Sequence, residues 1–171
     1  MSDHAATMAP EVPLRTWMAI VGASLGAFMA VLNIQIVGAS LDDIRGAFGA
    51  GADDGSWIST AYLVAEIVVI PLSAWLSKVF SPRRYLMVNA ILFLAFSAAC
   101  AFAQTLEQMI VLRALQGLAG GVLIPMAFTL IITLLPPSRQ PTGLALFGLT
   151  ATLAPAVGPL IGGWLTAAWG W

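Results

Sequence analysis

The stretch MIVLRALQGLAGGVLIPMAFTLIITLL at Met109–Leu135 decides the fold, because only one of its residues, Arg113, is charged. A helix rises about 1.5 Å per residue, so this stretch is long enough to cross a hydrocarbon core about 30 Å thick. Lipid offers no hydrogen-bond partner to an open strand or a loop, so a spanning segment has to be helical. We therefore expect a transmembrane helix here.

Four more apolar stretches are long enough to span a bilayer, at Trp17–Leu41, Trp57–Ser77, Tyr85–Ala103 and Thr142–Ala168. The chain is 60% hydrophobic and only 9% charged, whereas a soluble domain carries about a quarter charged residues. Too few charges remain to cover a surface that faces water. The sequence therefore predicts an all-α, polytopic membrane bundle of five helices.

Other classes of protein find little support. The net charge of -1 predicts no nucleic-acid partner, since phosphate binding needs a basic patch. The only histidine, His4, lies in the polar N-terminal segment, and Cys100 is the only cysteine. The chain has no HExxH, GxSxG, CxxC or phosphate-loop motif. We therefore expect no enzyme, no metal site and no cofactor.

Short polar connections separate the five stretches: an acidic, turn-rich loop at Asp42–Ser56, a basic one at Lys78–Arg84, then Gln104–Gln108 and Pro136–Pro141. Cytoplasmic loops are enriched in lysine and arginine. If the N-terminus is inside, the outer side has one positively charged residue, Arg45. The inner side has five: Arg15, Lys78, Arg83, Arg84 and Arg139. We therefore expect an inner (plasma) membrane protein with residues 1–16 as a cytoplasmic tail, and with its outer interface marked by Trp57, Trp164, Trp169 and Trp171.

Polar groups within the spans are candidates for function, because an ionised side chain at the bilayer centre is costly. Glu66 lies roughly 13 Å from the outer end of its helix, Asn33 roughly 12 Å and Arg113 roughly 6–9 Å. Gln35 and Gln116 flank two of them. One interpretation is a polar cavity in which Glu66 takes up and releases a proton. The alternative is that these groups only tie helices together by hydrogen bonds.

Small residues recur every four positions in three of the stretches, which places them on one helix face and lets backbones approach closely. They are Gly22, Gly26 and Ala30, then Gly117 and Gly121, then Ala154, Gly158 and Gly162. The last stretch also carries Pro155 and Pro159, which remove backbone donors and bend a helix. A tight packing seam is the simplest interpretation of this pattern.

These residues resemble a known family. Leu112-Arg113-Ala114-Leu115-Gln116-Gly117 resembles the RxxQG motif in helix 4 of EmrB/QacA-type drug:proton antiporters of the major facilitator superfamily. Gly158-Pro159-Leu160-Ile161-Gly162-Gly163 resembles the antiporter motif GPxxGG of their helix 5, and Val31–Val37 their LDxTIxN pattern, with Asn33 in the acidic position and Gln35 in that of the threonine. Further similar segments are Gly55-Ser56-Trp57-Ile58, Ala61-Tyr62 and Ile70-Pro71-Leu72.

One family motif is degraded. The loop that normally reads GxLxDRxGRR is here Ala74–Arg83, with Lys78 in the acidic position, and only the basic Arg83 and Arg84 survive. The charge-relay gating of that loop is therefore not carried over.

The resemblance implies helices 1–5 of a major facilitator N-terminal half, at 17–171, truncated before helix 6. It implies proton-driven export of small amphipathic, cationic or lipophilic compounds by alternating access, with Glu66 as the protonated group and Arg113 as its modulator. For the EmrB branch it also implies a periplasmic adaptor and an outer-membrane channel as partners. Two alternatives stay open: an exporter of a metabolite or siderophore, and a truncated, non-transporting membrane fragment.

Overall fold

The computed structural model describes residues 12–170, so most of the predicted tail and Trp171 lie outside the described residues. Every regular element in the described range is a helix, which confirms the predicted all-α class. The helices are α1 (Leu14–Ala39), α2 (Leu41–Phe48), α3 (Ala52–Val79), α4 (Pro82–Cys100), α5 (Leu106–Gly120), α6 (Leu123–Leu134) and α7 (Gln140–Trp169).

The five predicted spans are confirmed as α1, α3, α4, the pair α5 and α6, and α7, each long and apolar enough to cross a membrane. Large apolar side chains lie on the outside of this bundle, among them Ile67, Ile91 and Leu160. Water would penalise such a surface, whereas lipid chains accept it. The charged and amide side chains of Glu66, Arg113 and Gln116 are instead buried.

The segment Asp42–Ser56 is not the loop that its turn-forming residues predict. Leu41, Ile44 and Phe48 are spaced three and four positions apart, so they form one apolar face of the short helix α2. Ile44 is buried in a cluster with Ile58 and Met109. Gly49, with φ of 62°, ends the helix in the left-handed conformation that glycine adopts without strain. The apolar period of α2 therefore outweighs the local preference of its acidic residues for turns.

The fourth span is two helices rather than one. Its helix breaks between Gly120 and Leu123. Pro125 has no N–H group to donate to the carbonyl of Gly121, which removes one bond of a continuous helix at this point. The break lets α5 pack against α3 and α4 while α6 packs against α1.

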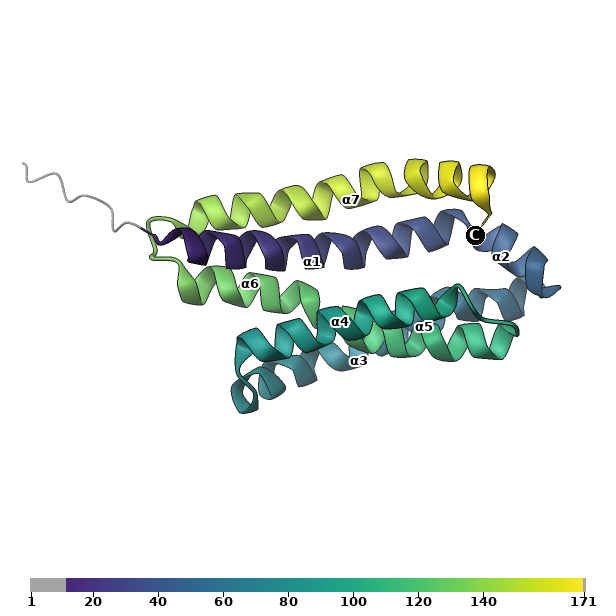
Figure 1. The fold of residues 1–171 in the computed structure, drawn as a ribbon, viewed down its shortest axis with the longest axis horizontal. Helices are drawn as coiled ribbons and strands as arrows, with labels where there is room; N and C mark the ends of the chain where they lie inside the picture. The colour runs from purple at the N-terminus through teal and green to yellow at the C-terminus, as the bar shows by residue number, and fades with distance from the viewer. Residues whose placement is uncertain (1–11, 171) are drawn as a thin grey trace, which may run out of the picture.

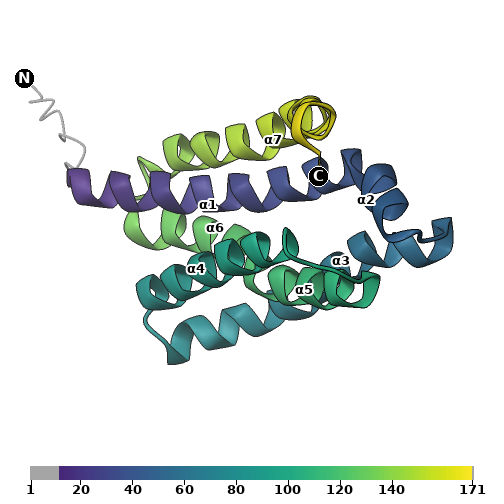
Figure 2. The ribbon, with the colours of Figure 1, turned by 45° about the vertical axis from the view of Figure 1, so that its right-hand side comes forward.

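The helices form two groups, visible in Figures 1 and 2. In one group α1 lies along α7, and in the other α5 lies along α3 and α4. Figure 1 also shows that the start of α1, the α3–α4 connection and the α6–α7 connection lie at one end of the bundle. Helix α2 and the α4–α5 connection lie at the opposite end, so the cation-rich connections share one side.

Close packing uses small residues, and not always the predicted ones. A Cβ on Gly121 would come within 2.8 Å of the Glu66 carbonyl oxygen, and one on Gly117 would collide with the Tyr62 carbonyl, which confirms this predicted seam. The predicted face of α1 is confirmed only in part: Ala30 is buried and Gly26 half-buried, but Gly22 is exposed with open space around it. The other buried small residues of α1 are Ala23, Ser24 and Ala27.

Candidate functional site

Arg113 lies at the centre of the buried polar groups. It projects from α5, is 2% exposed, and donates from Nη1 to Asn33 Oδ1 of α1 and to Gln116 Oε1 one turn further along α5, both at 2.6 Å. Its Nε donates a longer bond of 3.5 Å to the Ile58 carbonyl of α3. The structure thus brings together three of the predicted site residues, Arg113, Asn33 and Gln116, from two helices.

Tyr62 completes the surroundings of Arg113 from α3. The guanidinium carbon lies 4.4 Å from the centre of the Tyr62 ring, in the range of a cation–π contact. The ring is fully buried, and its hydroxyl has no hydrogen-bond partner within residues 12–170. The sequence argument missed this role for Tyr62, although its spacing of four from both Ile58 and Glu66 places all three on one face of α3.

Glu66 lies near this cluster but forms no ion pair with Arg113. The residue is 7% exposed, and in the described range its carboxylate has no hydrogen-bond or ion-pair partner. Glu66 lies one turn along α3 from Tyr62, whose ring contacts the Arg113 guanidinium. The structure therefore places a buried cation and a buried carboxylate near each other on α5 and α3 without joining them.

Gln35 lies elsewhere, against the antiporter-like motif of α7. A Cβ on Gly158 would collide with the Gln35 side chain, and one on Gly162 would come within 2.9 Å of the Ile36 Cα, so α1 and α7 approach closely here. Ala154, Gly158 and Gly162 form the buried face of α7 together with Gly143. The other motif residues, Pro155, Pro159 and Gly163, are exposed.

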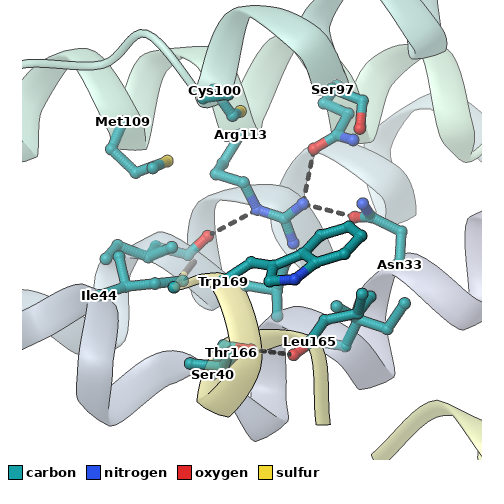
Figure 3. A pocket seen from close by; sticks show the side chains of 16 residues that line it. Asn33, Ser40, Ile44, Ser97, Cys100, Met109, Arg113, Leu165, Thr166 and Trp169 are labelled. Carbon is teal, nitrogen blue, oxygen red and sulfur yellow. Dashed lines mark hydrogen bonds between the residues drawn. The ribbon is translucent and has the colours of Figure 1, made fainter. Parts of the chain in front are cut away.

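A cavity of about 330 Å³ opens beside Arg113 at the α2 end of the bundle. Arg113, Asn33 and Gln116 form one wall, and the remaining lining is mainly apolar, with Ile44 from α2 and Trp169 from α7 (Figure 3). The Ser40 hydroxyl of α1 and the Thr166 hydroxyl of α7 share a hydrogen bond of 2.5 Å at its edge. Glu66 is not among the lining residues.

The basic connection between α3 and α4 lies away from this cavity. Lys78, Arg83 and Arg84 are exposed, and none of them pairs with a carboxylate among the residues that the structure describes. Within residues 12–170 the one ion pair joins Arg45 to Asp42 in α2.

The chain is similar to bacterial export and resistance proteins. The family model of the Major Facilitator Superfamily matches residues 23–171. Colistin resistance protein EmrB of Acinetobacter baumannii is 42% identical over 160 residues, which are 93% of this chain and 31% of that protein. Multidrug export protein EmrB of Haemophilus influenzae is 36% identical over 150 residues, 86% of this chain and 29% of that protein. Fatty acid resistance protein FarB of Neisseria gonorrhoeae is 35% identical over 147 residues, again 86% of this chain and 29% of that protein.

The chain therefore spans about a third of the length of the curated relatives that it matches. The resemblance to this family is confirmed. The five apolar spans lie almost entirely within the matched residues. The chain belongs to the Major Facilitator Superfamily.

Proposed function

We propose that this chain is part of a proton-coupled multidrug efflux permease that exchanges drugs for protons by alternating access. The observation that carries this proposal is the pair Glu66 and Arg113, two buried ionisable groups on facing helices with no ion pair between them. Buried charges are costly and usually paired, so an unpaired carboxylate in a membrane span is a candidate proton site. Names given to relatives, multidrug export protein among them, support export as the activity.

Glu66 takes up and releases the proton in this mechanism, and Arg113 modulates it through the field across the α3–α5 seam. Asn33 and Gln116 hold the guanidinium in place, because each accepts one of its hydrogen bonds. The glycine seams between α1 and α7 and between α3 and α5 keep the packing within each group of helices rigid. Both groups then move together as parts of one half of the transporter, which rocks against the other half.

The setting proposed for the protein is the inner membrane, with the N-terminus in the cytoplasm. Arg15, Lys78, Arg83, Arg84 and Arg139 lie on elements or connections at one end of the bundle, and Arg45 lies at the other, as the positive-inside rule predicts. By analogy with the EmrB branch, a periplasmic adaptor and an outer-membrane channel are proposed partners, with small amphipathic compounds as substrates.

Proton release from everted membrane vesicles tests the proposal. The transporter encoded by the gene is expressed, a pH gradient is generated by respiration, and ethidium is added while acridine orange reports the gradient. Ethidium should collapse part of the gradient for the wild type and not for Glu66→Gln, because the amide cannot carry a proton. Glu107→Gln, an exposed carboxylate in the first turn of α5, is the matched control and should behave as wild type.

Each outcome decides a separate point. An unchanged response in Glu66→Gln removes Glu66 from the proton pathway. A wild type that shows no proton release with ethidium or with a panel of other amphipathic drugs overturns drug:proton antiport itself.

A further inference from the structure

We propose that a groove between α3, α4 and α5 binds an anionic phospholipid, with the lipid phosphate at Arg84 and one acyl chain along the groove. This site is separate from the cavity beside Arg113 and goes beyond the proposed function, because its ligand belongs to the surrounding membrane and is not exported. Three features of the groove support it.

The first feature is the apolar body of the groove. Its volume is about 600 Å³, within the range of ligand sites. Arg84 and Phe96 both line it and lie twelve positions apart on α4, so the groove runs about 18 Å along this helix. That length is close to the depth of one leaflet, which is half of a hydrocarbon core about 30 Å thick. Other lining residues are Leu76, Val88, Leu92 and Leu118.

The second feature is the positive charge at one end of the groove. Arg84 lines the groove, and Lys78 in the last turn of α3 and Arg83 in the first turn of α4 lie near it along the chain. None of these exposed cations pairs with a carboxylate in the described range. The sequence has no aspartate or glutamate between Glu66 and Glu107, so α4 and the connection before it supply no counter-charge. Basic pockets between transmembrane helices bind anionic lipid headgroups for this reason.

The third feature is the position of this charged end. Arg84 belongs to the first turn of α4, and Figure 1 shows the α3–α4 connection at one end of the bundle, where lipid headgroups lie. The rings of Phe80 and Tyr85, which also line the groove, stack there with their centres 6.4 Å apart. Tyrosine favours this interface, because its ring is apolar and its hydroxyl is polar. The groove thus offers a polar end at headgroup depth and an apolar body at chain depth.

A phospholipid matches both parts of the groove. An apolar helix would cover the lining and leave the three cations without an anion. Inorganic phosphate would meet the cations and leave the apolar lining uncovered. A phospholipid with a net negative headgroup supplies the counter-charge and buries the apolar surface at once.

Competition binding tests the proposal. The transporter encoded by the gene is immobilised in detergent with radiolabelled phosphatidylglycerol, and unlabelled competitors are added. Phosphatidylcholine of the same acyl chains should bind at least tenfold more weakly than phosphatidylglycerol, since each basic side chain near an anionic lipid contributes about fivefold. Inorganic phosphate should displace nothing.

Two outcomes of this competition overturn the proposal. Equal displacement by phosphatidylcholine would leave the groove to an apolar occupant such as another helix of the transporter. Displacement by millimolar inorganic phosphate would show a site for the phosphate group alone.

The charged end is tested by variants of its exposed arginines. Arg83→Gln/Arg84→Gln should lower the affinity for phosphatidylglycerol at least tenfold, and Arg83→Lys/Arg84→Lys should keep most of it because the charge is retained. Arg139→Gln is the matched control, since it removes an exposed cation at the same end of the bundle but in the α6–α7 connection. An equal loss in Arg139→Gln would show that overall charge, and not this groove, selects the lipid.

The apolar body is tested by a neighbouring pair on α4. Leu92 lines the groove, whereas Ile91 is exposed outside it. Leu92→Trp should fill the groove and lower the affinity for phosphatidylglycerol at least fivefold, and Ile91→Trp should leave it unchanged. Equal affinities for the two variants would contradict the placement of the acyl chain.

Discussion

Asn33 Oδ1 lies 2.6 Å from Arg113 Nη1, across 80 positions of sequence. The bond connects α1 to α5, and so joins the α1–α7 group of helices to the group of α3, α4 and α5. Direct packing between α1 and α3 is sparse by comparison with packing inside either group. This charged hydrogen bond at the cavity wall thus adds a polar link to the apolar cluster of Ala30, Tyr62 and Phe93, which also joins the two groups.

Asn33→Leu should lower the stability of the bundle. The change leaves Arg113 buried with one acceptor fewer, and a hydrogen bond to a charged group contributes about 1.5–3 kcal/mol. The midpoint of thermal unfolding in detergent, followed by size-exclusion chromatography, checks this. Gln35→Leu is the matched control on the same helix: its amide makes no hydrogen bond in the described range, so an equal loss there would contradict the special role of Asn33.

Removing the Tyr62 ring should lower the stability of the bundle more than removing its hydroxyl does. The hydroxyl is buried and has no partner within residues 12–170, so Tyr62→Phe should leave the unfolding midpoint unchanged or raise it. Tyr62→Leu removes the cation–π contact with Arg113, which contributes about 0.5–2 kcal/mol, and also leaves space in the core. Equal midpoints for the two variants would show that the ring contributes nothing specific.

Gly117→Ala should destabilise the seam between α3 and α5. The added Cβ collides with the backbone of Tyr62, which cannot move aside as a flexible side chain can, and overpacking costs about 1–3 kcal/mol. Yield of monodisperse protein and the unfolding midpoint should both fall. Gly148→Ala has nothing within 4 Å of its new Cβ and should be neutral or stabilising, because alanine is the better helix former.

Within the GPxxGG-like motif, Gly162→Ala should reduce drug efflux, and Gly163→Ala should leave it unchanged. A Cβ at Gly162 approaches the Ile36 Cα to 2.9 Å and the Ile36 carbonyl oxygen to 3.0 Å, whereas Gly163 has open space. Drug efflux in intact cells, normalised to the amount of protein in the membrane, reports the difference. Equal losses would mean that the two glycines do not act through contact with α1.

The orientation of the chain can be tested with single cysteines. Cys100 is the only native cysteine, so Cys100→Ala provides a clean background. Arg139→Cys should react with a membrane-impermeant maleimide only after the cells are opened, and Asp54→Cys should react in intact cells. The reverse pattern would place the N-terminus outside.

Local sequence patterns predicted the membrane spans and most of the close helix contacts of this protein. Long apolar stretches predicted all five spans, because length and hydropathy act on each helix independently of its neighbours. The spacing of glycines likewise predicted the seams of α5 and α7. The same rule was wrong at Gly22 of α1, since Gly22 and Ala23 are both small and packing against α6 decides which one is buried.

The sequence by itself determined that the chain is a membrane bundle with the motifs of the Major Facilitator Superfamily, and with ionisable groups inside two of its spans. The tertiary structure decided their partners: Asn33 and Tyr62 meet Arg113, Gln35 meets α7 instead, and Glu66 stays outside the cavity. Depth along a helix follows from counting residues, but the direction in which a side chain points follows from how helices pack. That packing depends on contacts between distant segments, which no local pattern contains.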